Sequence, residues 1–469
     1  MTNIAAAITE VKALLGQRLN TSKSVCELHG QNETYFPKML PNAVAFPHNT
    51  LEVSKVVKIC EKYYCPIIPW GVGTSLEGHA LALHGGITLN MSEMNNTLEV
   101  NTQDMLAVVQ PGITREILNK ELRSTGLFFS VDPGANATLG GMAATRASGT
   151  TSVLYGTMRE NVLAMEIVLA DGKIIRTGTR AKKSSAGYDL NKLFVGSEGT
   201  LGIITELTVA LKGQPEAISA AVCDFESIDD AVNVVIMAIQ LGIPMARIEL
   251  IDEISIRAIN QYSKLDYPEK PHLFMEFHGS ITSVSGQAET ILSIAKDFQV
   301  GGFKWSTKSE ELNKLWAARH QAYYATKALF PNQIGMSTDI CVPISKLAKA
   351  IKDTQSDLKK YNVTGSIIGH VGDGNYHTLL FCDPTDPDDL KLNKLLANRM
   401  AKRALAVGGT VTGEHGIGIG KLNLMEQEHG SSLSIMTDLK KLFDPKNIMN
   451  PGKMINLSSK KIDDQLNSI

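Results

Sequence analysis

The chain has few cysteines, no long hydrophobic run and no visible targeting peptide. Its six cysteines form no CxxC pair, no CxxCH motif and no iron–sulfur spacing, so no attachment site for haem or a cluster is visible. No apolar run approaches the roughly 18 residues that a membrane helix needs, and the N-terminal stretch contains Glu10 and lacks a basic region. These absences predict reduced, mostly buried thiols, no transmembrane segment and a cytoplasmic protein. A peripheral contact at the inner membrane face stays open.

An excess of charge of one sign is also absent. The 46 basic side chains nearly balance the 48 acidic ones, which gives a net charge of −2. Proteins that bind nucleic acid usually carry a clustered basic surface, so the composition predicts no nucleic-acid partner. A length of 469 residues exceeds that of a usual domain and predicts at least two domains. The sequence leaves a homodimer open.

The common nucleotide-binding motifs are missing as well. In GVGTSL, Leu76 stands where the GxGxxG fingerprint needs its third glycine. In GIGIGKL, Leu422 follows the lysine where a Walker A loop needs Ser or Thr, and His415 stands at the position of its first glycine. Any phosphate binding therefore belongs to another architecture.

What the chain has instead is three glycine-rich segments. The first, Gly71–Gly78, follows a short apolar strand expected at Cys65–Pro69, and its missing side chains let backbone N–H groups approach an anion such as a diphosphate. The other two are DPGANATLGGMAATRASGTT and LFVGSEGTLGIITE. Small residues beside Thr138, Ser148 and Thr200 let an extended backbone lie against a large planar ligand. Ordinary tight turns are the alternative, and three successive segments weigh against it.

After Gly213 the pattern changes to alternating strands and helices. The expected strands are Ala217–Phe225, Ala246–Ile251, His272–His278 and Gly301–Trp305, and the expected helices are Ile228–Leu241 and Ser285–Phe298. The order is that of two βαβ units, which is typical of a ferredoxin-like sheet with helices on one face. This part of the chain is predicted to be a separate substrate or cap domain.

Two further segments, GHVGDGNYH and TGEHGIG, concentrate histidine and a carboxylate among glycines. Asp373–Gly374 favours a two-residue type I′ hairpin, which places His370 and His377 opposite each other on one face, with Cβ atoms roughly 5 Å apart. Glu414 and His415 follow in the second segment. Neutral imidazoles and one carboxylate suit Zn²⁺, Mn²⁺ or Fe²⁺ and leave coordination positions open for substrate. Structural histidines in a loop are the alternative.

One arginine stands out in the second half. A helix expected from Lys308 to His320 runs into LWAARHQAYY and carries Arg319 on an otherwise apolar surface. The guanidinium fork of arginine matches a carboxylate in two parallel hydrogen bonds. Arg319 is therefore a candidate clamp for a substrate carboxylate, and a solvated arginine at a helix edge is the alternative.

A set of motifs over about residues 40–456 resembles one known family. The motifs are PWGVGTSLEGH, DPGANATLGGMAAT, YGTMRENV, FVGSEGTLGIITE, STDICVPISKL, GHVGDGNYH, TGEHGIGIGK and DPKNIMNPGK. Together and in this order they resemble the FAD-dependent D-2-hydroxyacid dehydrogenases of the vanillyl-alcohol oxidase superfamily, and most of all the D-lactate dehydrogenase (cytochrome) branch. The glycolate oxidase flavin subunit and D-2-hydroxyglutarate dehydrogenase are close relatives of that branch.

The resemblance implies an α+β fold. It pairs a two-subdomain FAD-binding domain of the vanillyl-alcohol oxidase type with a ferredoxin-like α+β substrate (cap) domain. The expected parts are 1–40, an N-terminal helix and loop that pack on the FAD domain; 41–215, the FAD-binding domain; 216–425, the cap domain with the metal site; and 426–469, a C-terminal segment that returns to the FAD domain.

The resemblance also implies that the glycine-rich segments hold FAD. The residues expected to contact it are Pro69, Gly71, Gly73, Thr74, Ser75, Gly78, His79, Pro133, Gly134, Thr138, Gly140, Gly141, Ala144, Ser148, Gly199, Ile203 and Asn450. The sequence LEGHAL around His79 is similar to that of members with noncovalent flavin, so a covalent bond is not expected.

The same resemblance implies a metal on His370, His377 and Glu414, in agreement with the donor set above, and His415 as the catalytic base. Adjacent residues on a regular strand point to opposite faces. The glycines that flank the Glu414-His415 pair would permit the irregular backbone that aims both side chains at one site.

The implied reaction is the oxidation of a D-2-hydroxy acid, D-lactate above all, with Arg319 assisting the carboxylate. FAD would then pass electrons to an external acceptor: cytochrome c, a quinone or an electron-transfer flavoprotein. The hydroxyglutarate relatives have a lysine where this chain has Ser337, which favours a short substrate. The alternatives are glycolate or another D-2-hydroxy acid, an oxidase on the same fold, and a metal-binding or hydrolytic protein whose glycine loops are structural.

Overall fold

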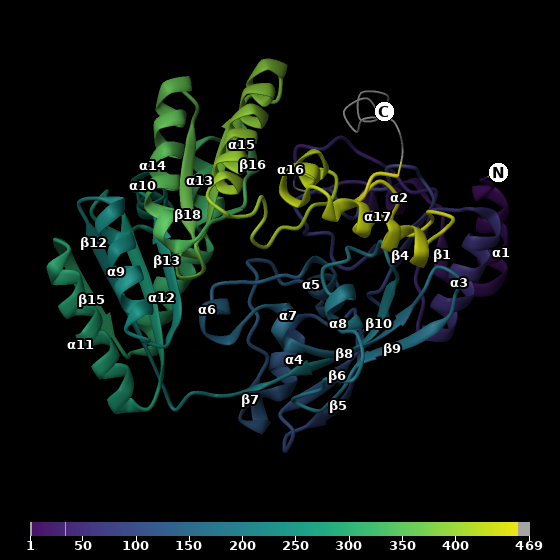
Figure 1. The fold of residues 1–469 in the computed structure, drawn as a ribbon, viewed down its shortest axis with the longest axis horizontal. Helices are drawn as coiled ribbons and strands as arrows, with labels where there is room; N and C mark the ends of the chain where they lie inside the picture. The colour runs from purple at the N-terminus through teal and green to yellow at the C-terminus, as the bar shows by residue number, and fades with distance from the viewer. Residues whose placement is uncertain (1, 33, 458–469) are drawn as a thin grey trace. The chain divides into compact units, whose positions relative to one another are not determined.

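The computed structural model describes residues 2–32 and 34–457, and the chain divides into two compact units (Figure 1). Of the described residues, unit 1 takes in those up to Ser148, Gly156–Gly213 and 414–457; the rest of the expected C-terminal segment, 458–469, lies outside the described residues. Unit 2 consists of Gly149–Tyr155 and Gln214–Gly413. The returning segment thus begins at Glu414, whereas residues up to 425 had been expected in the cap domain.

A four-stranded sheet forms the first half of unit 1, with strand order β1-β2-β4-β3. Strands β2, β4 and β3 are parallel, and β1 is antiparallel to β2. Helix α3 covers this sheet because its apolar face, with Val53, Val56 and Val57 fully buried, packs into the same core as the strands and α1. The elements are α1 (Ile4–Leu15), β1 (Leu19–Asn20), α2 (Lys23–His29), β2 (Ala43–Ala45), α3 (Thr50–Tyr63), β3 (Ile67–Trp70) and β4 (Ile87–Asn90).

A five-stranded antiparallel sheet forms the second half of unit 1, with order β5-β6-β10-β8-β9, over a separate core that includes Phe129 and Phe194. The two sheets are the two subdomains expected for this part. The elements are β5 (Thr97–Asn101), β6 (Leu106–Val109), α4 (Arg115–Glu121), β7 (Leu127–Phe128), α5 (Leu139–Thr145), α7 (Met158–Asn161), β8 (Val162–Val168), β9 (Ile174–Gly178), α8 (Leu190–Phe194), β10 (Ile203–Ala210), β11 (Lys212–Gly213), α16 (Met425–His429) and α17 (Ser432–Phe443).

Unit 2 is built on one large antiparallel sheet, with order β15-β12-β14-β13-β18-β19-β16 and β17 paired to β19. The predicted strands and helices are confirmed to within a few residues at their ends. The strands are β12 (Ala217–Phe225), β13 (Met245–Ile251), β14 (His272–Gly279), β15 (Val300–Ser306), β16 (Ile334–Ser337), β17 (Ile340–Cys341), β18 (Gly365–Gly369) and β19 (Asn375–Cys382).

Helices cover both faces of the unit 2 sheet. Helices α9 and α11, the two that the sequence predicts, contact β12. Ala220, Val222 and Phe274 point to the opposite face and pack into a core with α10, α12 and α13, where Trp316 is buried. The helices are α6 (Ser152–Tyr155), α9 (Ile228–Gln240), α10 (Glu253–Ser263), α11 (Ile281–Asp297), α12 (Ser309–His320), α13 (Ala322–Leu329), α14 (Ile344–Tyr361) and α15 (Pro387–Ala406).

The turn between β18 and β19 differs from the predicted hairpin. Val371–Asp373 form a single 3₁₀ turn, and within it and its cap only Gly374 has a positive φ, 75°, so this is no type I′ turn. His377 pairs with Ile368 and not with His370, which lies just beyond the end of β18. The prediction failed because the carbonyl of Gly374 accepts a hydrogen bond from the backbone that follows β17, so a neighbouring segment shapes the turn.

The described residues can be compared with two predictions from the sequence: reduced cysteines and no transmembrane segment. All six cysteines are unpaired, and all but Cys341 are buried. Among the described residues, none of the helices combines the length and the apolar content needed to cross a bilayer.

Candidate active site

Unit 1 brings the three glycine-rich segments together. A Cβ on Gly199 would lie 2.2 Å from Cγ of Pro69, and a Cβ on Gly71 would lie 2.2 Å from Oγ1 of Thr138. Neither distance is tolerable for a side chain, so these positions are restricted to glycine by close packing. Pro69, Gly71, Thr138 and Gly199, all expected to contact a cofactor, thus lie on adjoining segments.

Helix α5 lies at this meeting point. Oγ1 of Thr138 accepts from the N–H of Gly141 and caps the helix. At the other end, the N–H groups of Gly196 and Glu198 donate to the carbonyls of Ala143 and Ala144, each at 2.8 Å. The second and third glycine-rich segments are therefore held to each other by backbone hydrogen bonds.

The other predicted cofactor residues of unit 1 fall into two groups. Gly73, Thr74, Ser75, Pro133, Gly134, Gly141, Ala144 and Ser148 are exposed or half-buried, and a Cβ on Gly134 would meet open space. Gly78 and Gly140 are buried, and Ile203 is 1% exposed with its side chain in the core of the four-stranded sheet. From Ile203 only the backbone is left to contact a ligand.

Asn450 and His79 are buried at a junction of four motifs. Nδ2 of Asn450 donates to the carbonyls of His79 (3.0 Å) and Glu198 (2.8 Å), and its Oδ1 accepts from Lys453 (3.0 Å). The Asn450 amide is thus occupied by the protein itself. Nε2 of His79 lies 3.2 Å from Oε1 of Glu198, at ion-pair distance but outside hydrogen-bond geometry. Among the described residues, Nδ1 of His79 has no hydrogen-bond partner.

Glu198 is a buried residue of the candidate site that the sequence reasoning missed. Its side chain is 1% exposed, and its two oxygens accept from the N–H groups of Ile417 (2.7 Å) and Gly418 (2.9 Å). Burial raises the pKa of Glu198, but His79 and these two N–H groups outweigh burial and bring the pKa below its ordinary value. Its unusual positive φ of 54° marks a constrained position.

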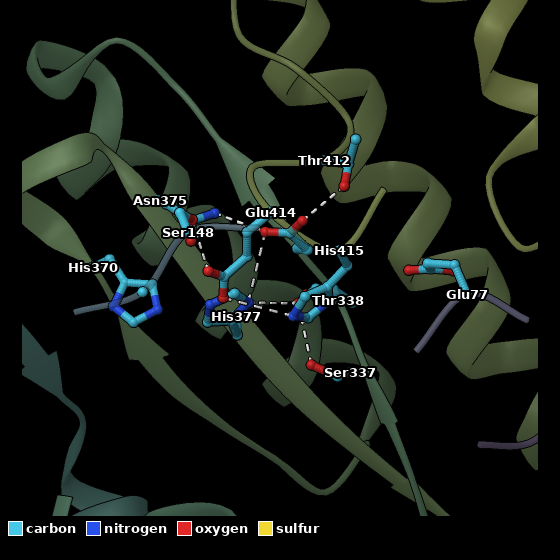
Figure 2. Close-up of polar contacts among 12 residues, drawn as sticks. Glu77, Ser148, Ser337, Thr338, His370, Asn375, His377, Thr412, Glu414 and His415 are labelled. Carbon is cyan, nitrogen blue, oxygen red and sulfur yellow. Dashed lines mark hydrogen bonds and ion pairs between the residues drawn. The ribbon is translucent and has the colours of Figure 1, made fainter. Parts of the chain in front are cut away.

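The loop anchored by Glu198 carries the predicted ligand and base. Gly416 and Gly418 have φ values of 77° and 48°, so the backbone is irregular, as the sequence predicts. Nε2 of His415 lies 3.8 Å from Oε1 of Glu414, and the two side chains therefore point to the same region. Oε2 of Glu414 accepts from Oγ of Ser148 at 2.8 Å (Figure 2).

In unit 2, His370 and His377 lie close together, with ring centroids 5.3 Å apart and the rings nearly perpendicular. Nδ1 of His377 faces the carbonyl of Thr338 at 3.1 Å (Figure 2), and Nδ1 of His370 faces Oε1 of Glu249 at 2.7 Å. Each acceptor favours the tautomer with the proton on Nδ1, and the lone pair of each ring is then on Nε2. Nε2 is then the nitrogen that each ring can offer to a metal.

Asp339 supports His377 and was also missed. It is fully buried, and it accepts from Nδ2 of Asn375 and Oγ1 of Thr412, each at 2.8 Å. Its Oδ1 lies 3.7 Å from Nδ1 of His377. A negative charge at this distance favours the Nδ1–H tautomer and strengthens the ring as a ligand. The only signal in the sequence was the Asp in STDICVP, which the family resemblance had linked to substrate length alone.

Arg319 is buried, not solvated. Its Nε and Nη2 donate to Oε2 of Glu249 at 2.9 and 2.5 Å, while the other oxygen of Glu249 faces His370. Burial raises the pKa of Glu249, but His370 and Arg319 together bring it below its ordinary value. The guanidinium is therefore held in place by Glu249, which the sequence reasoning had not singled out.

The residues present fit both expected groups. For a flavin, unit 1 offers close-packed backbone from three segments and the buried, unpartnered Nδ1 of His79. For a divalent metal, unit 2 offers two imidazoles whose Nδ1 atoms are already occupied by acceptors. Zn²⁺, Mn²⁺ and Fe²⁺ all accept imidazole and carboxylate ligands.

Comparison with known proteins assigns the chain to a family. The FAD binding domain matches residues 41–178, and the C-terminal domain of FAD linked oxidases matches residues 214–454. The chain belongs to the FAD-linked oxidase family. It is therefore a FAD-binding oxidoreductase, which confirms the resemblance seen in the motifs.

Relatives within this family match almost the whole chain. The probable mitochondrial D-lactate dehydrogenase of Danio rerio is 46% identical over 97% of this chain and 93% of its own length. The mitochondrial D-lactate dehydrogenase [cytochrome] of Arabidopsis thaliana is 41% identical over 96% of this chain and 80% of its own length. The glycolate oxidase subunit GlcD of Bacillus subtilis is 36% identical over 90% of each chain.

Solved structures confirm the predicted fold of this FAD-linked oxidase. A substrate-bound p-cresol methylhydroxylase superposes with a TM-score of 0.80 over 97% of each chain at 18% identity. A 4-ethylphenol oxidase from Gulosibacter chungangensis superposes with a TM-score of 0.78 over 96% of each chain, also at 18% identity. At these identities the likeness concerns the α+β architecture alone.

Proposed function

We propose that this FAD-linked oxidase is a metal-assisted dehydrogenase that oxidises a D-2-hydroxy acid, D-lactate above all, to the 2-oxo acid. The observation that carries the proposal is the histidine pair of unit 2. His370 and His377 lie close together, and Nδ1 of each ring faces an oxygen acceptor. The names of the relatives in Danio rerio and Arabidopsis thaliana support the choice of D-lactate.

The proposed metal ligands are His370, His377 and Glu414. A divalent cation held by these residues would supply a Lewis acid that makes the substrate hydroxyl more acidic. Ser148 orients the Glu414 carboxylate through its hydroxyl. The proposed metal is Zn²⁺, Mn²⁺ or Fe²⁺, each of which accepts imidazole and carboxylate ligands.

His415 is the proposed base and Arg319 the proposed carboxylate clamp. FAD, when bound, would supply a two-electron acceptor for the hydride that C2 of the substrate loses. His415 takes the hydroxyl proton at the same time, so that a C=O bond forms as the C–H and O–H bonds break. Arg319 is held by Glu249 through Nε and Nη2, and Nη1 is the donor that the clamp requires.

We propose that FAD is noncovalent and that the three glycine-rich segments named above and His79 would hold it. A short substrate is favoured because Ser337 has no positive charge to pair with a distal carboxylate. The electrons then pass to cytochrome c, a quinone or an electron-transfer flavoprotein. A second candidate substrate is glycolate, because the glycolate oxidase subunit GlcD of Bacillus subtilis is 36% identical to this chain over 90% of its own length.

Replacing the base tests this function. His415→Asn removes the proton acceptor while keeping a polar side chain of similar width, so we expect FAD to remain bound and its reduction by D-lactate to slow by about 10²–10⁴-fold. The measurement is the loss of flavin absorbance at about 450 nm, followed in a stopped-flow experiment without oxygen.

His429→Asn is the matched control. His429 ends the short helix α16 in the same C-terminal part of the chain and belongs to none of the motifs. We expect this variant to reduce FAD at the wild-type rate. Near-normal reduction in His415→Asn would remove His415 from the role of base.

A further inference from the structure

Glu249 is a fully buried carboxylate at the centre of unit 2. It lies on β13 with a relative exposure of 0%. Oε2 accepts from Nε and Nη2 of Arg319, which comes from α12, at 2.9 and 2.5 Å. Oε1 faces Nδ1 of His370, which follows β18, at 2.7 Å. One side chain therefore joins two groups that the sequence reasoning had treated separately.

Each oxygen of Glu249 has a distinct consequence. Oε2 of Glu249 accepts from both Nε and Nη2 of Arg319. Two hydrogen bonds from one guanidinium group fix the direction of its plane. The bond to His370 assigns the ring proton to Nδ1 and holds the ring plane, so the lone pair on Nε2 points in a defined direction. Without the carboxylate, the ring could rotate or change tautomer, and the buried Arg319 would lose its counter-charge.

We infer that Glu249 is the positioning residue of the active site, because it presents His370 to the metal and Arg319 to the substrate carboxylate. The inference rests on the proposed function, since it requires that His370 bind a metal. It adds a residue outside all the motifs, 121 positions before His370 in the sequence.

A second carboxylate of the same sheet provides a matched comparison. Glu276 on β14 also joins an arginine and a histidine: Oε2 lies 3.3 Å from Nη1 of Arg247, and Oε1 lies 2.9 Å from Nε2 of His278. However, Nδ1 of His278 bonds to the hydroxyl of Tyr155 at 2.7 Å, so both nitrogens of that ring are occupied by the protein. Glu276 thus resembles Glu249 in its contacts but supports no proposed ligand.

The test compares Glu249→Gln with Glu276→Gln in the full-length holoprotein. Each protein is stripped of metal and titrated with Zn²⁺ and Mn²⁺ against a chromophoric chelator. We expect Glu249→Gln to weaken metal binding by about 10–100-fold, as the loss of a hydrogen-bond partner of a ligand usually does. We expect Glu276→Gln to bind within about twofold of the wild type. Equal affinities for Glu249→Gln and the wild type would overturn the inference.

A second variant keeps the inference testable if Glu249→Gln does not fold. Arg319 would be left as an uncompensated buried charge, so the double variant Glu249→Gln, Arg319→Met removes both charges and is measured in the same titration. FAD content and the melting temperature report on the fold. Metal affinity that recovers to the wild-type value in the double variant would contradict a positioning role at His370.

The tautomer of His370 provides a signature that a merely structural role would not change. In the metal-free protein, ¹⁵N chemical shifts of the histidine rings should show His370 protonated at Nδ1 in the wild type and in Glu276→Gln, and a mixture of tautomers in Glu249→Gln.

A wild type that binds no metal while D-lactate still reduces its FAD would refute the metal part of the proposed function and this inference with it. A wild type that binds metal, with unchanged affinity and tautomer in Glu249→Gln, would refute the inference alone.

Discussion

The two units hold their functional groups by different means. In unit 1 these contacts have backbone on at least one side: glycines approach other segments too closely for a side chain, and the Glu198 carboxylate accepts from the backbone N–H groups of Ile417 and Gly418. In unit 2 the contacts are made by side chains: Glu249 holds Arg319 and His370. A site built from backbone requires glycine at fixed positions, whereas a site built from side chains requires supports that come from anywhere in the fold.

This difference explains which residues were visible in the sequence. Glycine clusters and the two histidine segments are local patterns, so they could be found by reading along the chain. Glu249 and Asp339 act on residues far away in sequence, and a single glutamate or aspartate in a strand carries no local signal. Supports of this kind are found only when the fold is known.

The largest effect is expected where the backbone of unit 1 is most crowded. In Gly418→Ala the new Cβ would lie 2.0 Å from the backbone carbonyl of Glu77, and φ is 48°. A backbone atom cannot move aside cheaply, so we expect a loss of about 2–5 kcal/mol in the free energy of unfolding, together with loss of FAD. Denaturant unfolding and the flavin content of the purified protein measure the two effects.

Gly126→Ala separates crowding from backbone strain. Gly126 has a φ of 72°, also left-handed, but a Cβ there meets nothing within 4 Å. We expect this control to cost only about 1–2 kcal/mol and to keep its FAD. If both variants lost the same stability and both kept their FAD, close packing would not be what holds the loop in unit 1.

A smaller effect is expected at Glu198. In Glu198→Gln one oxygen is replaced by an amide N–H₂ that faces another N–H, so we expect a loss of about 1–3 kcal/mol at neutral pH. The pKa of Glu198 is lowered in the folded protein, so its contribution is complete above the ordinary value of about 4.5 and is lost as the pH falls through the folded-state value. The stability difference between wild type and variant should therefore shrink at acid pH.

Glu206→Gln is the control for this pH series. Glu206 forms a partly exposed ion pair with Arg176, and such pairs contribute only about 0–1 kcal/mol. Denaturant unfolding at several pH values between about 3 and 7 gives both differences. A difference for Glu198→Gln that stays constant over this range would contradict the role of its ionised form.

Much of the fold could be predicted because its patterns are local. The strand Ala217–Phe225 and the helix beginning at Ile228 were placed at their observed starts, since alternation, an N-cap serine and helical spacing all agree there. The turn at Asp373–Gly374 could not be predicted, because its shape depends on a hydrogen bond from the segment after β17. The segment Gly149–Tyr155 belongs to unit 2, although the sequence had placed it with the glycine-rich part of the FAD-binding domain.

Within the candidate site, the residues proposed to perform the chemistry were visible in the sequence and their supports were not. His415, Glu414, His370 and His377 belong to short motifs with glycines beside them. Asn450 was also visible in a motif, but its amide turned out to bond to the carbonyls of His79 and Glu198. A motif thus indicates that a residue matters without indicating whether it touches a ligand or holds the protein together.

The most direct test of the account is the visible spectrum of the protein in the absence of oxygen, before and after adding D-lactate or L-lactate, with and without bound metal. We predict flavin bands near about 370 and 450 nm that bleach with D-lactate and not with L-lactate. We also predict that metal-stripped protein keeps its flavin but does not bleach until Zn²⁺, Mn²⁺ or Fe²⁺ is restored. Equal bleaching by both isomers, or undiminished bleaching of the stripped protein by D-lactate, would contradict the account.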